Sequence, residues 1–189
     1  MSSLKLALCV IAIGFVAGCT AYREVPPAKK QEIGGIFRVE PASSWSALKT
    51  GRGEIWTVDG FGLERLAFIT NVADGSPLLS QSQSKEAPTF HKDMTATDVV
   101  DLYEAMLTSN GYSQIKVVNL RPHSISGQDA FRFDYSGFDD KGLAKRGMVV
   151  ALIDAEKGLN LALYEAAEEH YFEAYKIDAE KVLGSLEKI

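Results

Sequence analysis

Both cysteines of this chain, Cys9 and Cys19, lie within its first 19 residues, and the sequence beyond them contains no thiol. A domain built from residues 20–189 therefore cannot be cross-linked by disulfide bonds and must be stabilised by packing alone. The same fact excludes a zinc–thiolate centre and a cysteine nucleophile from that region. Its length of about 170 residues suits one domain with a sizeable hydrophobic core.

The first 19 residues have the pattern of an export signal. Lys5 precedes a nearly continuous apolar run, residues 6–16, which stops shortly before Cys19. The run is too short to span a bilayer, because a membrane-spanning helix needs about 20 apolar residues. The last four positions, Val16-Ala17-Gly18-Cys19, resemble the lipobox of bacterial lipoproteins. This resemblance implies cleavage before Cys19 and lipidation of that cysteine with fatty acyl chains such as palmitate.

Lipidation of Cys19 implies that the protein is located in the cell envelope. Two or more acyl chains make attachment to a membrane stable, whereas a single chain holds only marginally. The next residue is Thr20, not the aspartate associated with retention at the inner membrane. The resemblance therefore implies a lipid anchor in the outer membrane, with the domain facing the periplasm.

The charge of the chain argues against other kinds of partner. Acidic residues outnumber basic ones by 25 to 20, which gives a formal net charge of −5. Binding to nucleic acids and binding to anionic lipids through a polybasic segment both need an excess of Lys and Arg. We therefore expect no nucleic-acid partner. The membrane is reached through the lipid anchor, and the further partner that we expect is an envelope protein.

The chain divides into three parts. Residues 1–18 are the lipoprotein signal peptide, and residues 19–35 read as the lipidated cysteine and a flexible tether, because this stretch is rich in proline, glycine and charge without apolar periodicity. Residues 36–189 form the single predicted domain. An alternative for the tether is that part of it packs on the domain as an extra edge of a sheet.

Most of the predicted domain has the alternation of β-strands. Segments rich in β-branched and aromatic residues predict strands at 36–39, 54–58, 63–72, 113–120, 129–135, 146–153 and 158–164. Turn signals at residues 59–62, 139–142 and 155–158 predict hairpins, which join antiparallel neighbours. Residues 73–92 show no period and are expected to form a long surface loop.

Two segments have the period of amphipathic helices. Residues 96–109 follow Thr95 and Asp98, an acidic variant of a capping box, and Gly111 stands where a left-handed residue ends a helix. Residues from about 170 to 187 form a second apolar stripe. Strands grouped in hairpins with two helices predict an α+β fold, a mostly antiparallel sheet of about six to seven strands flanked by the two helices.

This order of elements, together with Gly-x-Asp-Ala-Phe-Arg-Phe-Asp-Tyr at residues 127–135 leading into a hairpin, resembles the α/β/α sandwich of PsbP-like proteins. The resemblance spans residues 35–189. It implies a domain that binds partners without one shared chemistry, and it assigns no binding residue to any position of this chain.

Three polar groups are candidate sites for chemistry. Ser124 and Ser126 share a short polar loop with His123 and Asp129, but no Gly-x-Ser-x-Gly motif surrounds them, so a loop is the favoured interpretation. Acidic residues and a histidine cluster before the last helix and offer ligands for a divalent ion: Glu165, Glu168, Glu169, His170 and Glu173. However, the helix dipole favours acidic residues at the start of a helix even without a metal, so a solvated helix start is the favoured interpretation of this cluster. Asp139 and Asp140 are expected to form a turn, because they lack the spaced oxygen ligands of a calcium-binding loop.

The aromatic residues gather late in the chain, at strand and helix periods, which predicts a core: Phe131, Phe133, Tyr135, Phe138, Tyr164, Tyr171, Phe172 and Tyr175. They would line an apolar pocket only if the helix stood off the sheet. We assign Cys19 as the lipidation site and no catalytic, cofactor-binding or metal-binding residue. The sequence thus predicts a non-enzymatic binding or assembly module. The alternatives are a metal-dependent or hydrolytic envelope enzyme, and a carrier of a small apolar ligand.

Overall fold

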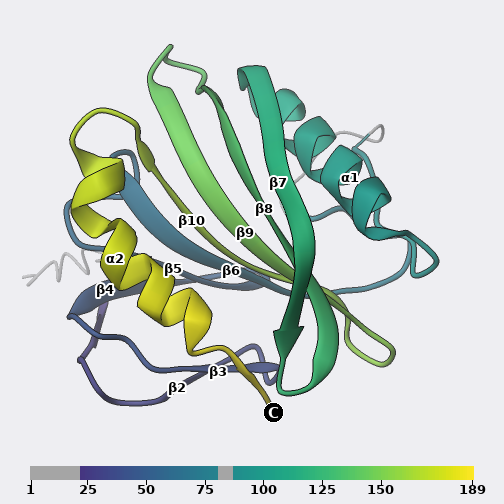
Figure 1. Ribbon diagram of the computed structural model, residues 1–189, viewed down its shortest axis with the longest axis horizontal. Coiled ribbons are helices and arrows are strands. Elements are labelled where there is room, and N and C mark those ends of the chain that lie inside the picture. Colours follow the sequence, from purple (N-terminus) through teal and green to yellow (C-terminus); the bar gives the residue numbers. More distant parts are fainter. Residues whose placement is uncertain (1–21, 81–86) are drawn as a thin grey trace, which may run out of the picture.

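The computed structural model describes residues 22–80 and 87–189. A strongly twisted antiparallel sheet of eight strands forms its centre, with one helix on each face (Figure 1). Across the sheet the strands are β1 (Arg23–Val25), β4 (Trp45–Thr50), β5 (Gly53–Thr57), β6 (Glu64–Val72), β10 (Gly158–Ala167), β9 (Ala144–Asp154), β8 (Gln128–Phe138) and β7 (Ser113–Ile125). The helices are α1 (Ala96–Ser109) and α2 (Tyr171–Gly184).

A second, small sheet lies beside α2 near the C-terminal end of the chain (Figure 1). Its strands are β11 (Glu187–Lys188), β3 (Phe37–Val39) and β2 (Gln31–Ile33), in that order. Ile33, Phe37 and Val39 are buried and belong to the core under α2. The small sheet therefore closes one end of that core.

The sheet separates two hydrophobic cores. The core on the α2 side contains Trp45 and Trp56 from the strands and Phe172 and Leu183 from the helix. The core on the α1 side is built around Phe133 and the buried face of that helix. α2 is also held by a two-pronged ion pair, in which the Arg132 guanidinium contacts the two Glu180 carboxylate oxygens at 2.9 and 3.1 Å.

α1 begins and ends as the sequence predicts. The Thr95 side chain accepts from the Asp98 backbone N–H, and the Asp98 carboxylate accepts from the Thr95 N–H, so the capping box is confirmed. Gly111 has a φ of 86°, and backbone bonds from Gly111 to Thr108 and from Tyr112 to Leu107 close the last turn. α2 is shorter than the expected 170–187, because its end at Gly184 lets residues 187–188 pair with β3.

The α+β class with two helices and an antiparallel sheet is confirmed, but the expected six to seven strands were too few. The structure has eight strands in the large sheet and three in the small one. Residues expected to form the tether instead form strands: β1 pairs with β4, and β2 pairs with β3. The alternative of an extra sheet edge is the one that the structure shows. The tether was predicted from the lack of a periodic pattern of apolar residues, and a strand of three residues is too short to show such a pattern.

Two stretches expected to be surface loops differ from that expectation. Within residues 73–92, Leu78 and Phe90 are buried in the α1-side core, and residues 81–86 lie outside the described part. The polar loop expected after residue 120 is β7 itself, which continues to Ile125 and returns through a two-residue turn. Both turn residues, Ser126 and Gly127, have positive φ, as a tight hairpin turn requires.

Candidate functional site

A row of polar residues crosses the sheet on the face covered by α1. Antiparallel pairing places Glu165 of β10 between Arg65 of β6 and Gly147 of β9, and Gly147 in turn faces Tyr135 of β8. Directly opposite residues of an antiparallel pair share a face, so the register alone brings these residues together. Glu165 is only 2% exposed.

The buried Glu165 carboxylate is surrounded by donors. Arg65 forms an ion pair with it at 2.8 Å, and the Tyr112 hydroxyl lies 2.9 and 3.1 Å from its two oxygens. The Tyr135 hydroxyl also donates to it, while Tyr103 of α1 donates to the Tyr135 oxygen at 3.3 Å. Burying a carboxylate is costly unless it is paired and bonded, and here both oxygens are.

Gly147 makes this arrangement possible. A side chain at this position would overlap the ring and hydroxyl of Tyr135. Without one, the Tyr135 ring lies across β9 and reaches Glu165 on the next strand. The glycine is thus required by a close approach and not by its backbone conformation.

The charge and burial of the cluster shift the protonation of its members. Burial, with the charge of Glu165 adding to it, raises the pKa of the Tyr103, Tyr112 and Tyr135 phenols above the ordinary tyrosine value. Burial has the largest single effect on Arg65 and lowers its pKa, but Glu165 and the surrounding tyrosines together outweigh burial and raise the Arg65 pKa. Burial lowers the pKa of nearby Lys145, whose ammonium donates to the Gly62 carbonyl.

Perturbed groups of this kind often mark a site of chemistry, yet here each carries a structural bond. The donors to Glu165 come from the sheet and from Tyr112 just beyond α1, and Tyr103 of α1 donates to Tyr135, so the cluster ties the helix to the sheet. Its hydroxyls, guanidinium and carboxylate are bonded to one another rather than directed at a cavity. We therefore interpret the cluster as a polar anchor in the core.

The structure separates the candidate metal ligands. Glu165 is buried in the polar anchor, whereas Glu168, Glu169 and His170 lie exposed between β10 and α2. Glu173 forms an ion pair with Arg146 at 3.2 Å. In residues 22–80 and 87–189, no group of three or more His, Cys, Asp or Glu side chains is placed to hold a metal ion.

The structure also keeps the other candidate residues that it describes apart from any catalytic arrangement. Ser124 and Asp129 face each other across the β7–β8 hairpin, while His123 is the next residue along the strand and points to the opposite face. The three are therefore not arranged as a triad. Asp139 makes the predicted turn, its carboxylate accepting from two backbone N–H groups of the hairpin. Cys19 lies outside the described residues.

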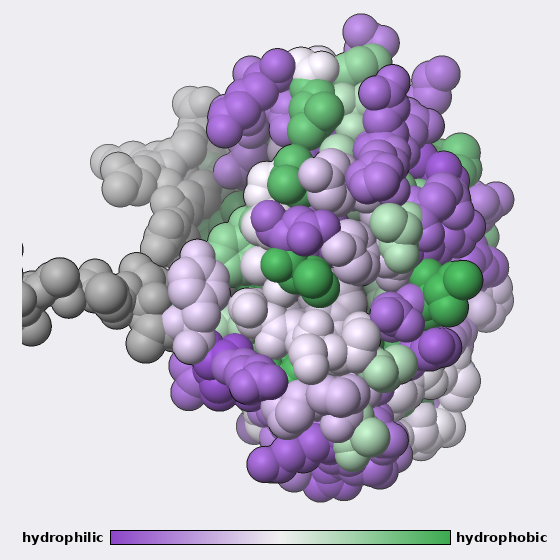
Figure 2. Space-filling model, turned by 90° about the vertical axis from the view of Figure 1, so that its left-hand side faces the viewer, coloured by the Kyte–Doolittle hydropathy of each residue, from purple (hydrophilic) through white to green (hydrophobic). Residues whose placement is uncertain are grey.

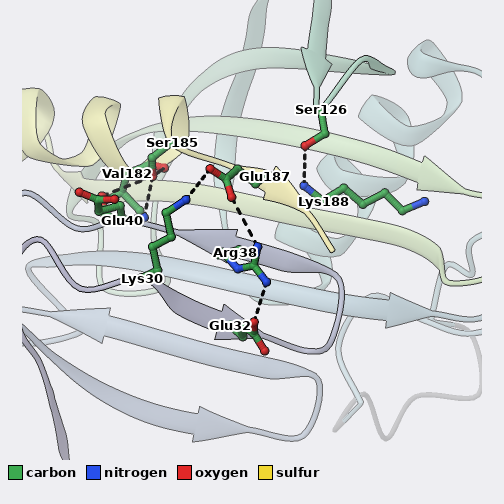
Figure 3. Close-up of polar contacts among 9 residues, drawn as sticks. All are labelled: Lys30, Glu32, Arg38, Glu40, Ser126, Val182, Ser185, Glu187 and Lys188. Carbon is green, nitrogen blue, oxygen red and sulfur yellow. Dashed lines mark hydrogen bonds and ion pairs between the residues drawn. The ribbon is translucent and has the colours of Figure 1, made fainter.

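A small charged pocket of about 190 Å³ lies between the small sheet and the end of α2 (Figure 3). Glu187 accepts from Lys30 at 2.8 Å and lies 3.8 Å from Arg38, which also bonds Glu32 at 2.8 Å. Ser185 bonds the backbone of Glu40 on the other side of the pocket. Because each cation here already faces an acid, the pocket presents no unbalanced charge for an ionic ligand.

A larger groove of about 460 Å³ opens at the far edge of the sheet, where α1 begins. Its apolar lining comes from α1, β7, β8 and β9: Ala96, Leu120, Pro122, Ala130, Phe131 and Ile153. Arg121 and Asp129 add a charge of each sign at its rim. Leu120 is 41% exposed and its neighbour Val118 is 52% exposed, so this edge offers apolar surface to solvent.

Sequence reasoning missed this groove, although Phe131 was among the aromatic residues considered for a pocket. The signal that was available is the pattern of β7, in which Val118 and Leu120 recur at strand spacing. These residues look like one buried face of a strand. They are exposed because β7 is an edge strand, and an irregularity in its pairing between Val118 and Arg121 places the two residues on opposite faces of the sheet.

The fold is similar to that of known structures. CyanoP, the cyanobacterial PsbP of Synechocystis sp. PCC 6803, matches with a TM-score of 0.53 and 16% identity, over 97% of this chain and 99% of that protein. LpqN of Mycobacterium tuberculosis, a protein involved in cell envelope biogenesis, matches with a TM-score of 0.49 and 11% identity, over 88% of this chain and 91% of that protein. No family model and no curated protein matches the sequence. The likeness to CyanoP confirms the expected PsbP-like fold, and it shows the fold alone.

Replacing Gly147 tests the polar anchor. We expect Gly147→Ala to lower the free energy of unfolding by about 2–4 kcal/mol, because the new methyl group displaces Tyr135 and leaves Glu165 short of a donor. Urea denaturation measures the change. Gly184→Ala is the matched control, since nothing lies within 4 Å of a side chain there, and it should be neutral or slightly stabilising. If Gly147→Ala lowers the free energy of unfolding by less than about 0.5 kcal/mol, the interpretation as a polar anchor is contradicted.

The raised tyrosine pKa values predict alkaline sensitivity. Unfolded phenols ionise near pH 10, whereas the raised pKa keeps Tyr103, Tyr112 and Tyr135 protonated in the folded state. The folded state then binds more protons, so stability is full below about pH 10 and falls as the pH rises further. Urea denaturation between about pH 8 and pH 11 measures this slope. In Tyr135→Phe the slope should be shallower by up to about 1.4 kcal/mol per pH unit; an unchanged slope would show that Tyr135 is not linked to alkaline unfolding.

Proposed function

We propose that this protein is a lipoprotein of the cell envelope, anchored through Cys19 in the outer membrane and facing the periplasm, where it acts as a binding or assembly module and not as an enzyme. The observation that carries the proposal is the sequence Val16-Ala17-Gly18-Cys19 behind a short apolar run. A cut before Cys19 leaves a single thiol at the new N-terminus. No other cysteine competes for the lipid.

Neither helix among the described residues is both long and apolar enough to cross a membrane. One feature of the folded part supports a role other than catalysis. The most perturbed titratable groups, around Glu165, are bonded to one another in the core, whereas an acid or base catalyst must reach a substrate.

Replacing each cysteine by serine in turn tests the lipid anchor. We expect Cys19→Ser to move the protein from the membrane fraction to the soluble fraction and to abolish labelling with radioactive palmitate, because the acyl chains supply the attachment. Cys9→Ser is the matched control and should change neither result, since Cys9 lies in the segment that is removed. A sucrose gradient that separates the two membranes should place the parent protein in the outer one. Unchanged labelling of Cys19→Ser would contradict the proposal.

A second function is favoured by the groove beside Phe131. Its volume of about 460 Å³ and its apolar lining match a site for a small apolar ligand, with Arg121 and Asp129 at the rim for orientation. The ligand would lie between the start of α1 and strands β7 to β9. This function is compatible with the lipid anchor.

A bulky residue in the groove tests this second function. We expect the neutral apolar dye N-phenyl-1-naphthylamine to fluoresce with the parent protein and to bind at least tenfold more weakly to Ala96→Trp, whose indole fills the groove. Ala174→Trp places the same side chain on the exposed face of α2 and should bind the dye as the parent does. Equal dye affinity in Ala96→Trp and the parent would rule out the groove as the site.

A further inference from the structure

The position of β1 limits how far the domain can stand from a lipid on Cys19. β1 begins at Arg23, so only residues 20–22 separate the proposed anchor from the first strand of the sheet. A fully extended chain rises about 3.3–3.6 Å per residue, which gives roughly 14 Å at most from Cys19 to Arg23. A domain of this size has a radius of gyration of about 15 Å, so it cannot hang clear of the bilayer on such a link.

β1 is firmly part of the sheet and cannot be counted as spare tether. Its three residues pair with β4, from Arg23 opposite Ala47 to Val25 opposite Trp45, and Val25 is fully buried. The Arg23 guanidinium also bonds the Glu54 carboxylate of β5 at 2.7 Å. Releasing the strand would expose Val25 and break this ion pair, so the edge of the sheet stays close to the anchor.

The residues around this edge suit the boundary between lipid and water. Tyr22 is 57% exposed and stacks on Phe61 of the β5–β6 turn, with 5.8 Å between the ring centroids. Val58, from the same turn, is 44% exposed. Aromatic side chains are favoured at the headgroup level of a membrane.

The side of the molecule on which α2 and β4 lie is nevertheless mostly polar. Hydrophobic residues are scattered among hydrophilic ones there and form no continuous patch (Figure 2). Such a surface lacks the apolar area that peripheral binding needs by itself. Contact with the membrane therefore follows from the lipid on Cys19 and the shortness of the link.

We propose that the β1 edge, with Tyr22, Phe61 and Val58, lies against the headgroup layer of the membrane that holds Cys19. This inference rests on the proposed lipidation and adds an orientation to it. β1 and β7 are the opposite edges of the eight-stranded sheet, seven strand spacings apart. At about 4.8 Å per spacing the path across the sheet from β1 to β7 is roughly 34 Å, so β7 is the edge farthest along the sheet from the lipid link.

Two tryptophan variants of the full lipidated chain test the orientation. Phe61→Trp places the reporter at the β1 edge, and Val118→Trp places it on β7 at an exposed position. The native Trp45 and Trp56 are buried, 2% and 0% exposed, and give the same background in both. Each protein is reconstituted into phosphatidylcholine vesicles with and without brominated acyl chains, which quench nearby indoles. We expect bromine to quench the emission of Phe61→Trp and to leave that of Val118→Trp unchanged.

A third variant tests whether the short link to Cys19, and not the surface of the domain, holds the β1 edge against the membrane. Insertion of 20 Gly and Ser residues between positions 21 and 22 of the Phe61→Trp chain adds a mean reach of about 25 Å, and quenching should then fall to the level of Val118→Trp. Flotation of the same vesicles reports the anchor independently. Protein that floats without quenching at position 61, or with equal quenching at 61 and 118, overturns the orientation and leaves the anchor intact. Protein that does not float overturns both.

Discussion

Strands β9 and β10 have to be covered on both faces, and the rest of the fold is arranged to cover them. Residues 148–152 of β9 are all buried, and β10 is buried from Leu159 to Ala167. α2 with the small sheet covers one face, and α1 covers the other. Without thiols, this two-sided burial of apolar surface is the main source of stability available to residues 20–189.

The polar anchor is the exception within this apolar arrangement. An ionised carboxylate such as Glu165 is costly in a core, and its bonds to Arg65, Tyr112 and Tyr135 offset that cost only when all partners are in place. Such a group rejects other registers of the surrounding strands, since a slip of one residue would turn Glu165 to the opposite face. The anchor therefore fixes how α1 and the strands meet.

Sequence patterns found the elements whose signals are local. Thr95, Asp98 and Gly111 gave both ends of α1, because caps are written in adjacent residues. Four strands were missed. β1, β2 and β11 have only two or three residues, which is too short to show a period. β4 has six residues, and its alternation of buried Trp45 and Ala47 with exposed Ser46 was overlooked. The polar anchor was missed because its members lie far apart along the chain. Glu165 looked like an acid near a helix start, and only the register of four strands shows that Arg65, Gly147 and Tyr135 lie beside it.

The pairing of β11 with β3 joins the end of the chain to its beginning. Glu187 lies opposite Arg38, and Lys188 reaches from the same strand to Asp154 at 2.5 Å. Contacts between residues so distant in sequence slow folding, because a large loop must close before they form. The hydrophobic layer beneath α2 is thus closed at one end by a strand whose partner lies far back in the sequence. A nascent polypeptide that has not yet reached residue 187 lacks the outermost strand of the small sheet, so this sheet cannot be complete before those residues are synthesised.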